Sequence, residues 1–162
     1  MFDTVLIAGL GLMGGSMAKT IKARTLSRVL GWNRTRATAE QALADGSIDA
    51  IATEALYKEA DLVIIGLYPQ ATVDWLLENM PKMKKGCVIV DMVGVKQFMV
   101  DHLEQAALDA GVHYVGGHPM AGREFSGLDY SLPTLFDGAS MIFVPTKSST
   151  ERVLEQLEVY FM

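Results

Sequence analysis

The chain has 162 residues, of which 50% are hydrophobic, 20% charged and 8% aromatic, and this composition is typical of a globular domain with a substantial core. Its 14 Lys and Arg against 19 Asp and Glu give a net charge of -5, which argues against the basic surface that nucleic acid or an anionic membrane requires. We therefore expect no nucleic-acid partner and no membrane partner.

The single cysteine, Cys87, lies in an apolar segment, which excludes a disulfide framework and fits a reducing compartment. The longest nearly unbroken apolar stretch, 62–68, is far shorter than the roughly 20 residues that a membrane-spanning helix needs. The first residues show no secretory signal. We expect a cytoplasmic protein with Cys87 in its core.

Strands and helices are predicted to alternate along most of the chain. Short apolar runs rich in branched side chains predict strands at 4–8, 29–32, 50–53, 61–66, 86–91 and 112–115. The stretches between them predict helices at 13–23, 35–44, 71–80 and 95–110. The pattern loosens over 122–138, and then predicts a strand at 140–144 and a helix at 151–161. This alternation predicts an α/β fold with a doubly wound, mostly parallel sheet.

No repeat or linker divides the chain, so we expect one domain over residues 1–162. The apolar residues of 154–161 have no obvious partner in the sequence that follows. We therefore expect the chain to be part of a longer protein.

The first predicted strand runs into a glycine motif, Gly9-Leu10-Gly11-Leu12-Met13-Gly14, which fits G-x-G-x-x-G and opens the first predicted helix. In a Rossmann-like domain the first glycine permits a tight turn, the second lets the backbone approach a pyrophosphate, and the third lets helix and strand pack closely. The helix N-terminus adds unpaired N–H groups and partial positive charge. We predict cofactor contacts from Gly9, Gly11, Leu12, Met13 and Gly14. The alternative is a tight turn that binds nothing.

The second predicted strand ends without the carboxylate that usually accepts hydrogen bonds from the ribose of NAD. The residues there are Asn33, Arg34, Thr35 and Arg36. Arginine and hydroxyl groups are able to bind a 2′-phosphate through charge-assisted hydrogen bonds. We therefore predict NADP as the cofactor, with NAD as the alternative if these arginines are ordinary surface charges.

Two further features follow predicted strands. Tyr68-Pro69 ends the strand at 61–66 and is predicted to line the cofactor cleft, unless it merely terminates the strand. The glycine-rich run 116–124 follows the strand at 112–115 and exposes His118 at the edge where open α/β sheets bind ligands. A lone histidine is often structural, but beside a dinucleotide loop it is suited to act as a general base, because its unperturbed pKa of about 6.5 lies near neutral pH.

Three segments together resemble prephenate dehydrogenases, the NAD(P)-dependent enzymes of tyrosine biosynthesis also called the TyrA family. The first is the glycine motif with Gly15 and Ser16, and the second is Asp91-Met92-Val93-Gly94-Val95-Lys96. The third is the run 117–127, which begins Gly-His-Pro-Met-Ala-Gly, with residues 135–139 following it. The resemblance covers the whole chain but only the cofactor-binding half of the family's architecture. It implies a C-terminal helical dimerisation domain that is absent from this chain, and a homodimer for the full-length protein.

The resemblance also implies the chemistry. His118 would draw the proton from the 4-hydroxyl of prephenate while hydride passes to the nicotinamide, and loss of CO2 would give 4-hydroxyphenylpyruvate. Lys96 would pair with a substrate carboxylate or brace its loop, or is a surface lysine. Glu124 would belong to the same polar cluster, or is likewise a surface residue.

One position departs from the family. Many members have serine where this chain has Gly94, and its hydroxyl helps to orient the histidine and the substrate. We expect Gly94 to lie near the cofactor, with another donor or a water replacing the hydroxyl, or with a different catalytic geometry.

The sequence therefore predicts an NADP-preferring prephenate dehydrogenase, of which this chain is the cofactor-binding domain and, alone, weakly active or inactive. Arogenate dehydrogenase or another hydroxyacid dehydrogenase is one alternative. A catalytically silent NADP-binding module is the other. We expect no metal ion.

Overall fold

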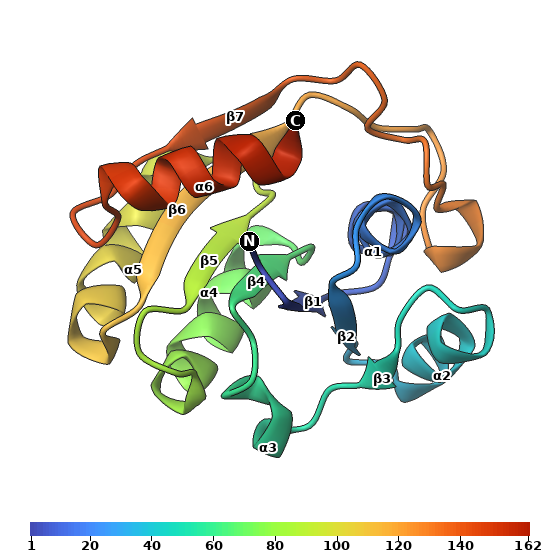
Figure 1. Ribbon diagram of the computed structural model, residues 1–162, viewed down its shortest axis with the longest axis horizontal. Coiled ribbons are helices and arrows are strands. Elements are labelled where there is room, and N and C mark those ends of the chain that lie inside the picture. Colours follow the sequence, from blue (N-terminus) through green and yellow to red (C-terminus); the bar gives the residue numbers. More distant parts are fainter.

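The computed structural model describes residues 1–162 as a seven-stranded sheet with helices on both faces (Figure 1). The strand order is β3-β2-β1-β4-β5-β6-β7, and every neighbouring pair is parallel except β6 with β7. The strands are β1 (Thr4–Ala8), β2 (Arg28–Trp32), β3 (Ala50–Ile51), β4 (Leu62–Ile65), β5 (Val88–Asp91), β6 (His113–Pro119) and β7 (Met141–Val144). This arrangement confirms the predicted doubly wound, mostly parallel sheet.

The helices cover the two faces of the sheet. They are α1 (Leu12–Arg24), α2 (Arg36–Ala44), α3 (Glu54–Tyr57), α4 (Pro69–Asn79), α5 (Lys96–Ala110) and α6 (Glu151–Phe161), with short 3₁₀ turns η1 (Met80–Lys82) and η2 (Leu128–Tyr130). Apolar residues of α1, α2 and α6 share one buried cluster, and those of α4 and α5 share the other. The short elements α3, η1 and η2 were not predicted, because one or two turns carry too little periodicity to be recognised.

The central strands are buried on both faces, which explains their unbroken apolar sequences. In β1, Leu6 belongs to the cluster beneath α4 and α5, while Ile7 belongs to the cluster beneath α1, α2 and α6. Every residue of β4 and β5 is likewise buried. Since successive side chains alternate between faces, each strand anchors both layers.

The predicted end of the sixth strand is wrong. We expected it at residue 115 with His118 in a following loop, but β6 continues to Pro119 and places His118 within a strand. The extension exists because β7 pairs antiparallel with it, with His118 opposite Ile142. Adjacent glycines, 116 and 117, concealed this in the sequence, since glycine is more typical of loops than of strands.

A long excursion separates β6 from β7. Residues 120–140 cross from the end of β6 to a position beside α1 and then return (orange in Figure 1). η2 packs directly on α1, where a Cβ added to Gly15 would lie 2.7 Å from Leu128 Cδ1. Residues 122–138, where the alternating sequence pattern is lost, therefore pack against α1 through η2.

The end of the chain packs more closely than its sequence suggests. Leu157 is fully buried, the Tyr160 ring meets Phe2 edge to face at 5.2 Å, and Phe161 meets Phe143 at 5.6 Å. These apolar residues therefore find their partners earlier in the chain, although Val159 is 75% exposed. No helix combines the length and the apolar character that a bilayer crossing requires.

Candidate functional site

The glycine motif joins β1 to α1, and the structure requires glycine at some of its positions but not at others. Gly9 has a φ of +92°, and a Cβ there would lie 2.6 Å from the Gly66 carbonyl oxygen. A Cβ at Gly14 would lie 1.7 Å from the Gly9 carbonyl oxygen. A Cβ at Gly11 would meet nothing within 4 Å. The fold therefore requires Gly9 and Gly14, whereas Gly11 faces open space, as expected of a backbone that a ligand approaches closely.

The N-terminus of α1 is suited to a diphosphate. Gly11 is the N-cap and provides no side-chain acceptor, and the first turn, which begins with Leu12 and Met13, contains no acidic residue. The first N–H groups of the helix are thus left for a ligand, and the helix dipole favours negative charge there. These residues fit the pyrophosphate of a dinucleotide, and no part of the loop obstructs it.

Asn33 links the glycine motif to the end of β2. Its Oδ1 accepts a hydrogen bond from the Leu10 N–H at 2.9 Å, and its Nδ2 donates to the Thr35 carbonyl at 3.0 Å. The residue also lines a cavity of about 300 Å³, together with Gly11, Thr38, Gln41, Gly127, Leu128 and Asp129. Asn33 therefore shapes both the loop and the cavity.

The predicted phosphate-binding residues, 34–36, lie in the chain between Asn33 and Thr38, which line this cavity, but do not line it themselves. Arg34 is exposed and forms no ion pair, whereas Arg36 Nε lies 3.1 Å from Glu40 Oε1 on the outer face of α2. Thr35 is the N-cap of α2, and its side chain makes no capping hydrogen bond. Arg34 and the Thr35 hydroxyl are thus uncommitted, while Arg36 has a competing partner.

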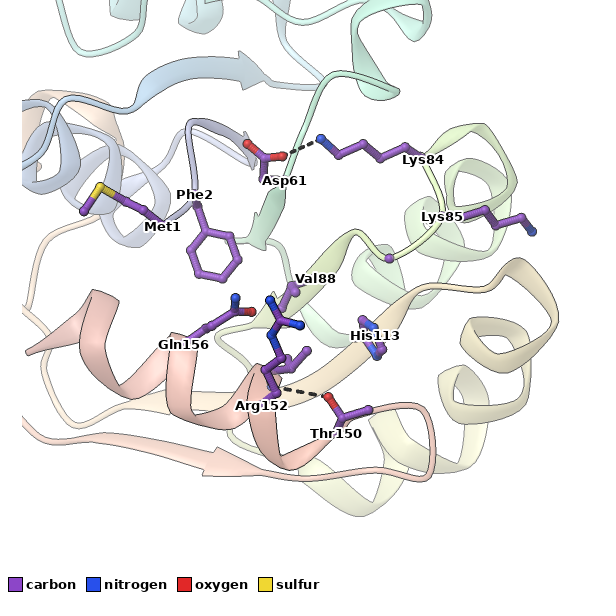
Figure 2. A pocket seen from close by; sticks show the side chains of 12 residues that line it. Met1, Phe2, Asp61, Lys84, Lys85, Val88, His113, Thr150, Arg152 and Gln156 are labelled. Atoms are coloured by element: carbon purple, nitrogen blue, oxygen red, sulfur yellow. Dashed lines mark hydrogen bonds and ion pairs between the residues drawn. The ribbon is translucent and has the colours of Figure 1, made fainter.

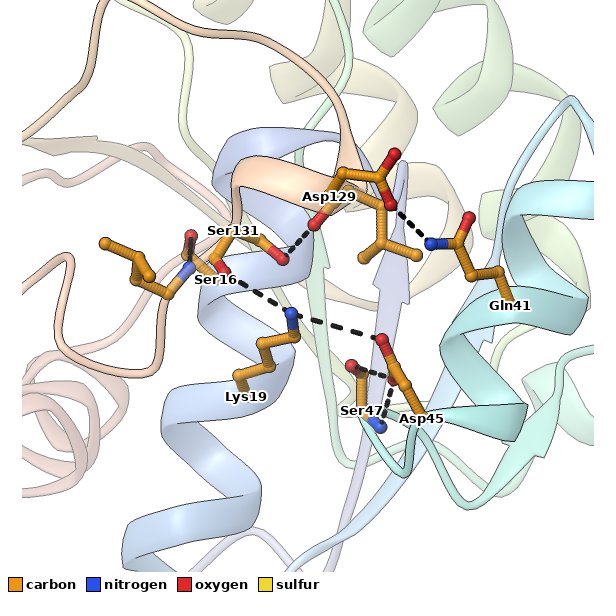
Figure 3. A network of polar contacts seen from close by, with 9 residues as sticks. Ser16, Lys19, Gln41, Asp45, Ser47, Asp129 and Ser131 are labelled. Carbon is orange, nitrogen blue, oxygen red and sulfur yellow. Dashed lines mark hydrogen bonds and ion pairs between the residues drawn. The ribbon is translucent and has the colours of Figure 1, made fainter.

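Residues 127–129 of the excursion between β6 and β7 form the other wall of the cavity. Polar contacts join the excursion to α1 and α2 (Figure 3). Lys19 Nζ donates to the Ser131 carbonyl at 3.3 Å, and the Ser16 hydroxyl accepts from the Leu132 N–H at 3.0 Å. Gln41 Nε2 donates to Asp129 Oδ1 at 2.5 Å. Sequence analysis missed Gln41 and Asp129, because no motif marks them and their positions are 88 residues apart.

Tyr68 and Pro69 lie at the same edge of the sheet as the glycine motif. Pro69 begins α4, and Tyr68 is its N-cap with 86% of its surface exposed. The preceding Gly66 packs against the motif, since a Cβ there would lie 3.0 Å from the Gly14 nitrogen. The pair therefore ends the strand and also stands beside the predicted cofactor cleft.

A buried polar cluster supports the loop that follows β5. Asp91 is fully buried and accepts hydrogen bonds from the Val93 N–H at 2.8 Å, from the Tyr114 hydroxyl at 2.6 Å and from Lys96 Nζ. Burial lowers the pKa of Lys96, and the Asp91 charge opposes that shift. Burial and the same charge both raise the pKa of Tyr114. The Lys96 ammonium thus points at Asp91, and the lysine braces its loop.

The braced loop brings Gly94 against His118. A Cβ on Gly94 would lie 3.6 Å from Cε1 and 3.9 Å from Nδ1 of the histidine ring, and would meet no other atom within 4 Å. His118 Nδ1 is buried and has no hydrogen-bond partner on the protein. The third predicted catalytic residue, Glu124, is exposed in the excursion and makes no hydrogen bond or ion pair. The structure therefore brings Gly94 to His118 and Lys96 to Asp91, and leaves Glu124 exposed.

A larger cavity, of about 450 Å³, lies at the opposite edge of the sheet (Figure 2). It is lined by residues that begin strands, such as Val88 and His113, and by the Asp61–Lys84 ion pair. Ligands in open α/β sheets bind outside the carboxyl ends of the strands. The smaller cavity at the glycine motif is therefore the candidate cofactor site.

Together the sheet, the glycine motif and the open helix N-terminus define a dinucleotide-binding domain of the α/β class. The comparison with family models is specific: residues 17–162 match the prephenate dehydrogenase nucleotide-binding domain. The chain belongs to this family.

Relatives and solved structures agree with that assignment. Prephenate dehydrogenase of Bacillus subtilis strain 168 is 36% identical over 98% of this chain and 43% of its own length. The crystal structure of A. aeolicus prephenate dehydrogenase with hydroxyphenyl propionate and NAD+ has a TM-score of 0.89 at 27% identity, covering 99% of this chain and 57% of that one. Synechocystis arogenate dehydrogenase has a TM-score of 0.86 at 25% identity, over 96% and 55%. The chain spans about half the length of these proteins.

Proposed function

We propose that this chain is the nucleotide-binding part of a prephenate dehydrogenase that prefers NADP and converts prephenate to 4-hydroxyphenylpyruvate. The observation that carries the proposal is the position of His118, at the carboxyl end of β6 beside the Gly94 loop, on the sheet edge that also holds the open N-terminus of α1. A base and a dinucleotide site on one edge are what an alcohol-oxidising dehydrogenase requires.

His118 acts as the general base in this proposal. Nδ1 is buried near Gly94, so Nε2 is the ring nitrogen that faces the substrate in this proposal. It takes the proton of the 4-hydroxyl as the C4–H bond breaks, and the ring carboxylate leaves as CO2 to give an aromatic product. When bound, the nicotinamide accepts the hydride. Asp91 and Lys96 act as positioning residues, because their ion pair holds the loop that contacts the histidine.

The preference for NADP is proposed from the segment that follows β2, whose Asn33 and Thr38 line the 300 Å³ cavity. Arg34 is free of ion pairs, Thr35 has an uncommitted hydroxyl, and the residue at the end of β2 is Asn33 and not a carboxylate. A 2′-phosphate gains charge-assisted hydrogen bonds from such groups. Asp129, on the other wall of the cavity, is the one carboxylate among its lining residues.

Calorimetric titration of the chain with NADP and, separately, NAD tests the cofactor proposal. We expect tighter binding of NADP. Arg34→Gln should weaken NADP binding by about 10-fold or more, the range for a charged hydrogen bond, and leave NAD binding unchanged. Arg152→Gln is the matched control, since this exposed arginine lines the cavity at the opposite edge. Equal affinity of the wild-type chain for both cofactors would contradict the preference.

Asp129 provides a second test of the same cavity. Replacing it by asparagine keeps the size of the side chain and removes the charge that faces the proposed phosphate. Asp129→Asn should raise NADP affinity about two- to fivefold, as expected for a solvent-screened charge, with little effect on NAD. A larger effect on NAD would place Asp129 at a ribose hydroxyl instead.

The role of His118 is tested by His118→Asn in a form of the protein that turns over prephenate. We expect most of the kcat to be lost while the Kd for the cofactor stays within about twofold, because general-base catalysis contributes about 10²- to 10⁴-fold. Retained turnover would remove His118 as the base.

Arogenate is the second candidate substrate, favoured by the structural similarity to the Synechocystis arogenate dehydrogenase. The two substrates differ at the side chain, far from the hydroxyl that the histidine would deprotonate. Comparison of kcat/KM for the two substrates decides between them, and a larger value with arogenate would replace prephenate in the proposal.

A further inference from the structure

The proposed function makes no use of the cavity of about 450 Å³ at the amino-terminal edge of the sheet (Figure 2). Its lining includes the cationic residues Lys84, Lys85 and Arg152, whereas Asp61 is the one carboxylate there. The chain as a whole has a net charge of -5, so this concentration of positive charge runs against the overall composition. A cavity whose walls carry an excess of positive charge attracts anions.

The carboxylate of Asp61 does not oppose an anion in this cavity. Asp61 Oδ2 accepts hydrogen bonds from the Asp3 N–H at 2.9 Å and from the Thr4 N–H at 2.8 Å, and Oδ1 accepts one from Lys84 Nζ. The negative charge is therefore neutralised within the wall. An ammonium group has further N–H donors, so Lys84 is still able to bind a second acceptor.

The charges of the other two cations are uncompensated. Lys85 Nζ donates to the Ala110 carbonyl oxygen at 2.8 Å, and this neutral partner leaves the charge of the lysine intact. Neither Arg152 nor Gln156, one turn further along α6, forms a side-chain hydrogen bond or an ion pair with the protein. Figure 2 shows both side chains extending from α6 toward Phe2. A free guanidinium offers a planar fork of donors that matches a phosphate or a carboxylate.

The floor of the cavity is apolar. Phe2, Val88 and Val153 line it and are 6%, 3% and 5% exposed. Water is limited on that side, and this reduces the screening of charges that face the cavity. The Thr150 side chain already caps α6, since it accepts the Val153 N–H at 3.3 Å. Side chains, and not the end of the helix, therefore provide the donors.

We propose that this cavity binds a small oxyanion with two negative charges, of the phosphate or dicarboxylate class. The Arg152 guanidinium and the Gln156 amide donate hydrogen bonds to its oxygens, and the ammonium groups of Lys84 and Lys85 balance the remaining charge. The site lies at the edge of the sheet opposite the candidate cofactor cavity. It therefore does not depend on the proposed dehydrogenase function.

The experiment is a series of ¹H–¹⁵N correlation spectra of the chain, recorded at neutral pH without cofactor or substrate. Sodium phosphate and, separately, sodium malonate are titrated against sodium chloride of the same ionic strength. The Arg152 Nε–H and the amides of Gly86 and Val153 report on this cavity, and the amides of Gly11 and Leu12 report on the glycine motif. We expect saturable shifts at the cavity with a Kd on the order of 1 mM for the better anion, which identifies the class.

Two variants test the assigned cations. Arg152→Gln should weaken binding of that anion about fivefold or more, and Lys85→Gln about twofold, since exposed charges are partly screened. Lys58→Gln is the matched control, because this exposed lysine lies outside the cavity and forms no ion pair. All three side chains are exposed, so we expect each variant to fold as the wild type does.

Three results would overturn the proposal: shifts that sodium chloride reproduces, shifts confined to the glycine motif, or an Arg152→Gln variant that binds as tightly as the wild type. The reporting groups lie in the cavity itself, and no cofactor is present. A negative result is therefore distinct from a failure to bind NADP or to turn over prephenate.

Discussion

Removal of the Lys96 ammonium should destabilise the domain strongly, because its partner is a carboxylate with no access to water. The Asp91 side chain is 0% exposed and that of Lys96 is 16% exposed. Breaking a buried ion pair by deleting one partner typically costs about 3–5 kcal/mol. The Val93 N–H and the Tyr114 hydroxyl still bond Asp91 after the change, so we expect the lower end, about 3 kcal/mol, for Lys96→Met.

Urea denaturation followed by tryptophan fluorescence measures this loss. Trp75 is buried and its ring lies 5.5 Å from that of Trp32, so unfolding changes the environment of both. With an m value of about 2 kcal/mol/M, a loss of about 3 kcal/mol lowers the midpoint by roughly 1.5 M. Lys147→Met is the matched control, since that side chain is 82% exposed, and its midpoint should scarcely change.

A double variant separates the unpaired charge from the lost packing. Asp91→Asn combined with Lys96→Met leaves no buried charge, so the double variant should be more stable than Lys96→Met alone. The reasoning fails if Lys96→Met loses less than about 1 kcal/mol, or if the added Asp91→Asn makes the protein less stable still.

Three further results are expected. Gly11→Ala should weaken cofactor binding at least about 10-fold and leave the urea midpoint unchanged. Gly14→Ala should also lower the urea midpoint, because its Cβ would lie 1.7 Å from a carbonyl oxygen. The opposite pattern would contradict the assignment of the motif. Burial raises the pKa of the Cys87 thiol to about 12, so it should react with a thiol reagent at neutral pH only after unfolding, and rapid labelling of the native chain would contradict its burial. Burial opposes ionisation of Asp61, but the hydrogen bonds from Lys84 and from the Thr4 and Asp3 N–H groups, together with the Lys84 charge, outweigh it and hold the pKa below 3.8. The stabilisation from the ionised Asp61 is complete above that value and is lost as the pH falls through the lower folded-state pKa. Asp61→Asn should therefore reduce the decline in the free energy of unfolding below about pH 4, and an unchanged decline would refute this.

The parallel part of the fold was predictable because its central strands are buried on both faces. Runs such as 62–65 have no polar residue to interrupt them, and a glycine or a turn bounds each one. The glycine motif was predictable for the same local reason, since its function depends on backbone conformation within six consecutive residues. The strands and the glycine motif could be predicted because each depends on residues that are consecutive in the sequence.

Features made by distant segments were not predictable. The extension of β6 depends on pairing with β7, so nothing near His118 indicated a strand. The contact of Asp129 with Gln41 depends on where the excursion lies against α2. The Tyr114 hydroxyl reaches Asp91 only because β5 and β6 are neighbours in the sheet.

The excursion from β6 to β7 makes the histidine strand difficult to transplant. Residues 120–140 connect the strand of His118 to its antiparallel partner, and on the way they pack against α1 and line the candidate cofactor cavity. A designer who moved only 113–119 into another dinucleotide-binding sheet would lose the pairing that keeps the histidine in a strand. The smallest segment that could be transferred is therefore 113–144. The first helix of the receiving protein would need small residues at the positions of Gly15 and Ser16, against which the excursion packs.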